Sequence, residues 1–162
     1  MRQRAFQMRF YLEDITEDQF VTEEIESLLY DTTKIVLDNL LGKKAEKVDL
    51  TIIIDDDCYD EGCDGYCIET DKNTFDVFLG SHLWQWDEDK KIREIVTTLA
   101  HELVHVAQFV KGLLKNKSAE ITVYEKKTFI LSETDYEDRP WEKEAFALQT
   151  LLANIVINQM GE

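Results

Sequence analysis

The first apolar pattern in the chain has a period of two. Phe6, Met8, Phe10 and Leu12 alternate with more polar residues in the stretch "AFQMRFYL". Side chains of a strand point to opposite faces in turn, so this alternation predicts a strand with one buried face.

The second pattern has the period of an α-helix, because apolar side chains return every three or four positions after Thr22. Thr22 is the candidate N-cap, and Gly42 suits the end of the helix. The predicted buried face consists of Val21, Ile25, Leu28, Leu29, Thr32, Val36 and Leu40.

Three short segments then predict strands. Residues 48–54, "VDLTIII", form an apolar, β-branched run that ends at an acidic turn, which is typical of a buried strand. Residues 65–70 and 74–80, "GYCIET" and "TFDVFLG", predict two strands joined by the turn "DKN". If residues 74–80 form the edge of a cleft, they could bind an extended peptide by backbone pairing.

The second half of the chain predicts two long helices separated by a hairpin. The first helix begins at Asp87 and ends at Gly112. Residues 120–132, "EITVYEKKTFILS", predict a hairpin that turns at "EKK". The last helix opens at Pro140, where a missing amide donor does no harm, and runs to Gly161. The order of elements predicts a single α+β domain over residues 1–162.

The composition favours a folded domain with an acidic surface. Of the 162 residues, 44% are hydrophobic and 10% aromatic, which is typical of a chain that buries a core. The formal net charge of −16 would repel a phosphate backbone, so we expect no direct binding of nucleic acid. Nothing in the sequence indicates an oligomeric state.

No sequence signal places the chain in or across a membrane. No segment approaches the roughly 20 consecutive apolar residues that span a bilayer. The N-terminal stretch is basic but has no continuous apolar run, so we expect no signal peptide. The odd number of cysteines, Cys58, Cys63 and Cys67, suggests reduced thiols, and we expect a cytoplasmic location.

The three cysteines lie in an acidic stretch, "IDDDCYDEGCDGYCIETD". The glycine and acidic positions of an EF-hand calcium loop are not matched there. The C-x4-C-x3-C spacing also lacks the two C-x2-C pairs of a structural zinc site. We favour a solvated acidic loop, and a redox-sensitive disulfide or a second metal site stay open as alternatives.

The predicted helix before Gly112 carries the motif H-E-x-x-H in "TTLAHELVHVAQ". His101 and His105 are four residues apart, so their Cβ atoms lie about 5–6 Å apart on one helix face. Both rings can then bind one ion at roughly 2.0–2.1 Å, as in zinc sites. Glu102 points about 100° away around the helix, where it can reach a water molecule on the metal.

The motif has a purely structural alternative, in which two core histidines bond to neighbours and Glu102 is exposed at the edge of the helix. The surrounding residues argue against it, because they are uncharged and predict a deeply buried helix. Histidine and glutamate in such a helix need groups that satisfy them. A metal ion with a water molecule satisfies all three side chains.

A catalytic zinc site needs a third protein ligand. Metzincins would have glycine and a third histidine where this chain has Gln108 and Lys111, so that class is excluded. We predict Glu144 as the third ligand, because it shares the apolar stripe of the last helix. Glu142 is the alternative, although its position off that stripe is typical of a solvated first-turn residue.

Other polar residues are weaker candidates. Asp135 and Asp138 lie in an acidic loop, which makes them less suitable as ligands. His82 precedes the helix and is either an outer partner of the site or a strand-end residue.

The segments "LAHELVHVAQF" and "YEDRPWEKEAF" resemble the small gluzincins and SprT-like peptidases of prokaryotes and their phages. The resemblance covers residues 97–146 well and the preceding strands more loosely. It implies a zincin-like fold, Zn²⁺ as the metal and hydrolysis of peptide bonds. The implied ligands are His101, His105 and Glu144, with Glu102 as general base. SprT-like proteins often carry a C-terminal zinc ribbon, which the 162 residues do not include.

The sequence therefore predicts a zinc metallopeptidase that acts on a peptide or protein substrate. Glu102 would take a proton from the zinc-activated water and return it to the leaving amine. A further donor would stabilise the oxyanion. We favour Tyr136 for this role, with Tyr124, Arg139 and His82 as other candidates. The alternative function is an acidic zinc-containing protein that binds a basic partner or mimics DNA and has little peptidase activity.

Overall fold

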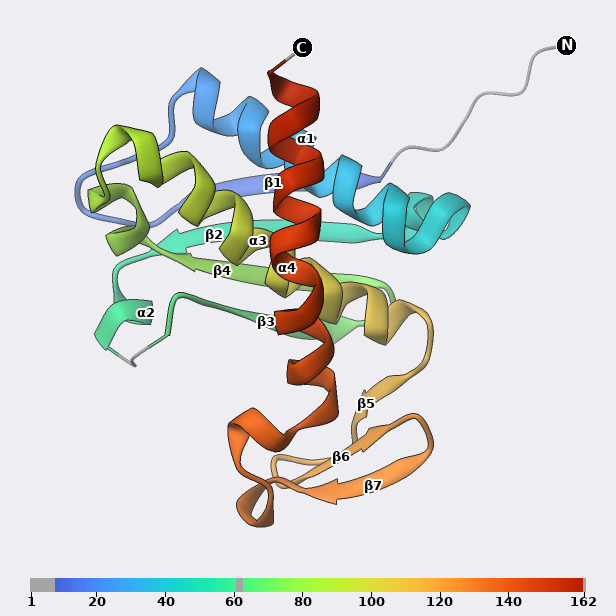
Figure 1. Ribbon diagram of the computed structural model, residues 1–162. Coiled ribbons are helices and arrows are strands. Elements are labelled where there is room, and N and C mark those ends of the chain that lie inside the picture. The colour runs from blue at the N-terminus through green and yellow to red at the C-terminus, as the bar shows by residue number, and fades with distance from the viewer. Residues whose placement is uncertain (1–7, 61–62, 162) are drawn as a thin grey trace, which may run out of the picture.

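The computed structural model describes residues 8–60 and 63–161, and its main layer is a four-stranded sheet (Figure 1). The strand order is β1-β2-β4-β3. The strands β1, β2 and β4 are parallel, and β3 runs antiparallel to β4. The strands are β1 (Arg9–Asp14), β2 (Asp49–Asp55), β3 (Gly65–Asp71) and β4 (Thr74–Gly80).

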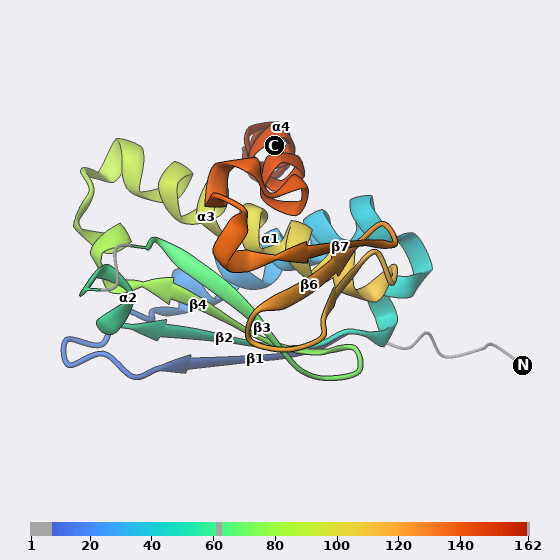
Figure 2. The ribbon, with the colours of Figure 1, turned by 90° about the horizontal axis from the view of Figure 1, so that it is seen from below.

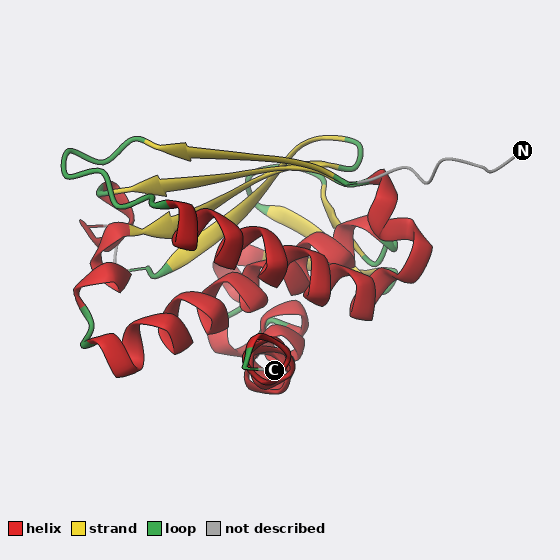
Figure 3. Cartoon of the chain, turned by 90° about the horizontal axis from the view of Figure 1, so that it is seen from above, coloured by secondary structure: helices red, strands yellow, loops and turns green. Residues whose placement is uncertain are grey.

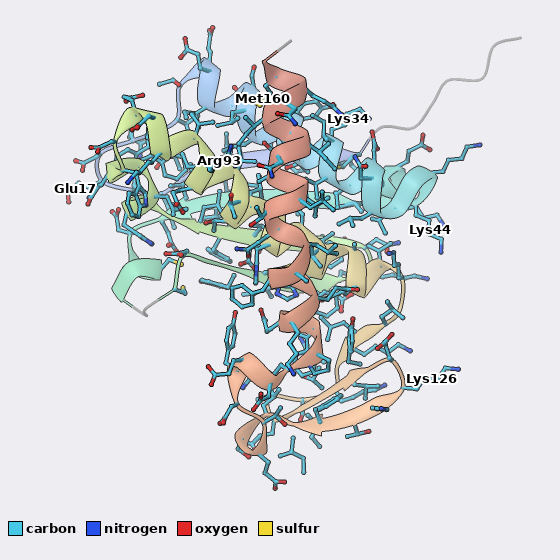
Figure 4. All side chains as sticks on the ribbon, in the orientation of Figure 1. Glu17, Lys34, Lys44, Arg93, Lys126 and Met160 are labelled. Carbon is cyan, nitrogen blue, oxygen red and sulfur yellow. The ribbon has the colours of Figure 1, made fainter. Side chains whose placement is uncertain are left out.

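The long helices lie on one side of this sheet, as Figures 2 and 3 show from opposite directions. They are α1 (Glu23–Leu41), α3 (Glu88–Val110) and α4 (Pro140–Met160). Helix α4 crosses α3 on the side away from the sheet. The Arg93 guanidinium donates a hydrogen bond of 2.8 Å to the Asn154 side chain and so ties α3 to α4. Arg93 is labelled on α3 in Figure 4.

The core lies between the sheet and the helices. Residues of β2 and β4 alternate between buried and half-buried, because successive side chains of a strand face opposite sides of the sheet. The buried set packs against apolar residues of α1 and α3 in one continuous cluster. From the two strands, this cluster receives Leu50, Ile52, Ile54, Phe75, Val77 and Leu79.

A second, three-stranded sheet lies beside the N-terminal end of α4 (Figure 1). Its strands, in spatial order, are β5 (Leu114–Asn116), β6 (Ile121–Tyr124) and β7 (Lys127–Ile130). Glu125 and Lys126 form the β6–β7 turn with φ of 49° and 70°. Leu114 and Tyr124 pack against Trp141 of α4, so this sheet supports the start of that helix.

Shorter elements connect these parts. They are the helix α2 (Asp57–Asp60) and four 3₁₀ segments, Gly42–Lys47, Ser81–Gln85, Leu131–Glu133 and Tyr136–Asp138. Among the helices of the described residues, none combines the length and the apolar content that crossing a membrane requires.

The structure confirms the predicted α+β class and the order of the main elements. The Thr22 hydroxyl accepts a hydrogen bond of 3.2 Å from the Ile25 amide, which confirms the predicted N-cap of α1. Phe6 lies outside the described residues. Strand β5 and helix α2 were not predicted, because segments of three and four residues are too short to establish a period.

The idea that residues 74–80 form a cleft edge is wrong. They form β4, which is paired with β2 on one side and β3 on the other, so both of its backbone edges are used. The strand β3 is the outer strand of the sheet on this side. An added peptide strand would therefore have to pair with β3.

Candidate metal centre

Helix α3 places the two motif histidines in the interior. The residues from Leu99 to Gln108 are all buried, as the apolar pattern of this segment predicts. His101 and His105 lie one turn apart, and their ring planes are nearly perpendicular, at 84°. Each histidine is only 6% exposed. Both imidazoles face the start of α4, where their Nε2 atoms meet a carboxylate.

That carboxylate belongs to Glu142, in the first turn of α4. Its Oε1 lies 3.0 Å from His101 Nε2 and 3.2 Å from His105 Nε2. One ligand atom from each residue can be chosen so that all three lie within 4.8 Å of one another. Donors at the usual bond lengths around a tetrahedral zinc lie roughly 3.3 Å apart, so the spacing fits one ion. The buried His-His-Glu group could therefore hold a metal ion.

Glu144 does not join this group, contrary to the preference drawn from the apolar stripe. Its Oε1 accepts hydrogen bonds of 2.8 Å from Gln108 Nε2 and 3.3 Å from the Tyr124 hydroxyl. Residues two apart on a helix point about 200° away from each other, so only one of the two glutamates can face the histidines. Of the predicted stripe of α4, Ala145, Leu148 and Leu152 pack on the core, but Leu151 is 58% exposed. Glu142 in the first turn meets the histidine pair instead.

Glu142 is therefore a buried residue rather than the solvated one that its position suggested. It is 8% exposed, and the Tyr136 hydroxyl donates it a hydrogen bond of 2.8 Å. Desolvation acts to raise the pKa of Glu142, but the hydrogen bonds from His101 and His105 outweigh it and hold the pKa below its usual value. The carboxylate is thus ionised and available as a ligand.

Glu102 directly follows His101 on α3 and, together with both histidines, lines a cleft in the protein surface. It is 6% exposed, so the alternative in which this residue sits exposed at the helix edge is wrong. Burial raises the pKa of Glu102 to about 7, against the opposing charges of His105 and His101. A carboxyl group with this pKa can both take up and release a proton near neutral pH.

Without a metal ion, the His105 ring carries protons on both nitrogens at neutral pH. Desolvation acts to lower its pKa, but the hydrogen bond to Glu142 and the charges of Glu102 and Glu142 raise the pKa of His105 to about 9. A metal ion must displace this proton, so binding at this site is linked to proton release.

Two glutamines hold the outer nitrogens of the histidines, and neither was predicted. His105 Nδ1 lies 2.8 Å from Gln108 Oε1, and His101 Nδ1 lies 2.8 Å from Gln149 Oε1. Such partners orient metal-binding imidazoles. A signal for Gln108 was present in the sequence, because this amide lies one turn after His105 on a helix that was predicted to be buried.

The group opens into a cleft of about 620 Å³. The cleft is bounded by β3, the middle of α3 and the first turns of α4. Among the described residues, its lining includes no lysine or arginine, but it includes four acidic and several aromatic side chains. These are Asp64, Glu94, Glu102 and Glu142, with Tyr66, Phe109, Tyr136, Trp141 and Phe146.

Tyr136 is the predicted oxyanion donor that the structure brings to the site. It lines the cleft, and burial and the Glu142 charge raise the pKa of its hydroxyl, which therefore stays protonated. Arg139 lies over the Tyr136 ring, with its Cζ atom 5.7 Å from the ring centroid. Its Nε and Nη2 donate to the carbonyls of Thr134 and Leu131, so the guanidinium holds the loop before α4.

The other candidates lie farther from the ligand group. The Tyr124 hydroxyl bonds to Glu144. His82 does not line the cleft, but its Nε2 lies 2.8 Å from Oδ1 of Asp64, which does. Asp135 and Asp138 lie in the loop before α4 and do not join the ligand cluster.

The cysteines do not build a second metal site among the described residues. Cys58 Sγ and Cys63 Sγ lie 2.6 Å apart, and neither residue is in a disulfide. Cys67 lies on β3 and lines the cleft. Desolvation and the charge of Glu102 raise the pKa of the Cys67 thiol well above its usual value, so it is a poor ligand or nucleophile.

Comparison with known proteins adds no family to this description. No protein-family model matches the chain, and a search of curated proteins finds no significant match.

Proposed function

We propose that the chain is a zinc-dependent metallopeptidase with a zincin-like arrangement of its active-site helix. The observation that carries the proposal is the convergence of His101, His105 and Glu142 beside the buried Glu102 in an open cleft. Two imidazole nitrogens and one carboxylate oxygen are a donor set that zinc accepts in catalytic sites, with one position left for water.

Bound zinc would polarise a peptide carbonyl and lower the pKa of a water molecule to about 7. Glu102 would accept the proton of that water and then donate it to the leaving amine. Its pKa of about 7 supports both steps. The Tyr136 hydroxyl would turn from Glu142 to the oxygen on which negative charge develops.

The cleft supports a peptide as the substrate. The outer edge of β3 is free of pairing with other described strands, and Gly65, Tyr66 and Cys67 of this strand line the cleft. An extended peptide can bind such an edge through its own backbone. The substrate would then lie along β3 with one peptide bond opposite Glu102.

The chemistry of the cleft favours a cationic peptide. Asp64 and Glu94 line the cleft, and no lysine or arginine from the part of the chain that the structure describes lines it with them. Two aromatic residues of the lining, Tyr136 and Phe146, are each about half exposed and can cover apolar side chains of a peptide.

The first test measures metal content and peptide cleavage together. The wild-type protein should contain about one zinc per chain and cleave a diverse peptide library. Glu102→Gln should keep the zinc and reduce cleavage by about 10²–10⁴-fold, the usual contribution of a general acid–base group. Glu46→Gln is a matched control on an exposed surface outside the cleft.

A metal-free wild-type protein would contradict the proposal. Zinc without cleavage would contradict the peptidase and would favour the acidic zinc-containing binding protein instead. Cleavage that is unaffected by Glu102→Gln would show that another group moves the proton.

A further inference from the structure

The two histidines have different support on the side away from Glu142. Each Nδ1 meets a glutamine oxygen at 2.8 Å, yet one glutamine comes from α3 itself and the other from α4. Gln108 is 2% exposed, whereas Gln149 is half-buried and lines the cleft. The difference lies in what holds each amide in place.

The Gln108 amide has only one possible orientation. Its Nε2 donates to the Trp141 carbonyl at 3.0 Å and to Glu144 Oε1 at 2.8 Å. Both partners act as acceptors, because one is a backbone carbonyl and the other is a carboxylate oxygen that also accepts from the Tyr124 hydroxyl. A rotated amide would turn its oxygen towards two acceptors and its nitrogen towards His105, at the cost of both bonds.

This orientation dictates which nitrogen of His105 can bind metal. With Gln108 Oε1 facing it, the His105 Nδ1 must carry hydrogen, so the lone pair of the neutral ring lies on Nε2. That nitrogen is the one that faces Glu142. The amide therefore selects the tautomer of His105 that the ligand group needs.

Gln149 imposes no comparable restriction on His101. Of the described residues, none accepts a hydrogen bond from Gln149 Nε2, so this amide can rotate by 180° at little cost. Only the oxygen-in orientation matches a protonated Nδ1 on His101. The tautomer of His101 is therefore fixed by the metal rather than by its glutamine.

We propose that Gln108, anchored by Glu144, is the positioning residue that presents His105 Nε2 to the metal, and that His101 has no equivalent anchor. The inference rests on the proposed metal centre. In this proposal Glu144 acts on the ligand His105 through two hydrogen bonds, one between Glu144 and Gln108 and one between Gln108 and His105. The Tyr124 hydroxyl, which donates to Glu144, connects this network to β6.

The test compares zinc affinities by competition with a chromophoric chelator. Gln108→Leu should weaken zinc binding by about 10–100-fold, the usual effect of losing a partner that orients a ligand. The matched variant Gln149→Leu should weaken it by less than about fivefold, because that amide is not anchored. Glu144→Leu should behave as a weaker form of Gln108→Leu, whereas Glu144→Gln keeps an acceptor oxygen and should match the wild type.

A spectroscopic measurement separates positioning from a general loss of stability. In zinc-loaded protein with ¹⁵N-labelled histidine, Nδ1–H of His105 should give a slowly exchanging signal in wild type and Gln149→Leu. In Gln108→Leu and Glu144→Leu this signal should exchange at least about tenfold faster, while that of His101 stays unchanged. Folding of each variant is checked by circular dichroism, and Glu144→Leu provides the test if Gln108→Leu does not fold.

Equal zinc affinities and equal exchange in wild type, Gln108→Leu and Glu144→Leu would overturn the inference while leaving the metal centre intact. An equal loss in Gln108→Leu and Gln149→Leu would also overturn it, because the two histidines would then be equally supported. A wild type without zinc would instead contradict the proposed function itself.

Discussion

The candidate metal centre joins two helical segments whose surroundings differ. The middle of α3 is enclosed by the sheet, α1 and α4, and each of its residues from Leu99 to Gln108 is buried. The first turns of α4 lie at the edge of the molecule, where Phe146 is 52% exposed and Glu142 is 8% exposed. In α3, the spacing of residues along the helix is enough to place the two histidines on one face. In α4, the position of Glu142 depends on contacts with other segments of the chain.

The chemistry is divided in the same way. Helix α3 carries both imidazoles and the buried Glu102, which the core holds in place. Helix α4 supplies Glu142, which Tyr136 holds from the loop before the helix. The α3 half of the site is thus held by the core, whereas the α4 half is held by contacts near the surface, and residues of both halves line the cleft.

The largest expected effect tests the buried half. His105→Ala removes one of the two histidines of the ligand group, and the third histidine of the chain, His82, does not belong to that group. Zinc should be lost from the purified protein, together with peptide cleavage. His82→Ala is the control, because His82 is outside the ligand group, and it should keep the zinc. If atomic absorption showed one zinc per chain in His105→Ala, His105 would not be a required ligand, and the role given to α3 would be contradicted.

The next largest effect tests the part of the site on α4 by comparing two glutamates of that helix, Glu142 and Glu144. Glu142→Gln should weaken zinc binding by more than the roughly 10–100-fold typical of an outer partner, because it removes the anionic ligand itself. Glu144→Gln should change it by less than about threefold, since the amide oxygen still accepts from Gln108. The opposite ranking in a chelator competition would return the ligand role to Glu144.

The pH dependence of zinc binding sharpens the account of the buried half. The pKa of His105 is raised to about 9 in the metal-free protein, so zinc competes with a proton below that pH. The apparent affinity should therefore rise by about tenfold per pH unit from pH 7 towards pH 9 and then level off. Calorimetry in buffers of different ionisation enthalpy should show about one proton released at pH 7. An affinity that does not change over this range would contradict the protonated state of His105.

A smaller effect is expected from the acidic wall of the cleft. Glu94→Lys should lower kcat/KM for lysine- and arginine-containing peptides by about 5–10-fold, because a charge pair near the surface contributes about 1 kcal/mol. It should leave neutral peptides nearly unchanged. Glu46→Lys makes the same change in net charge outside the cleft and is the control. A similar loss in both variants would attribute the preference to the overall charge of −16 rather than to the cleft.

The sequence predicted the fold class and the α3 half of the site because both depend on local periodicity. The alternation in residues 74–80 and the apolar stripe around His101 each reflect one element packing on one core. The i, i+4 spacing of the histidines then places two ligands on one face without any knowledge of the rest of the chain.

The third ligand could not be predicted in this way. The stripe argument identified Glu144 as a polar residue that needs a partner, and the structure supplies Gln108 and Tyr124 rather than a metal. Glu142 is buried because the loop before α4 folds Tyr136 over it, which is a contact between segments that periodicity does not describe. The position of β4 inside the sheet depends in the same way on the crossover that places β2 beside it.

The central claim is that His101, His105 and Glu142 hold one zinc ion, and anomalous diffraction at the zinc edge from crystals grown with zinc tests it most directly. The account predicts a single peak per chain, about 2.0–2.2 Å from His101 Nε2, His105 Nε2 and a Glu142 oxygen. A peak bound by Glu144 instead, or no peak between α3 and the start of α4, would contradict it.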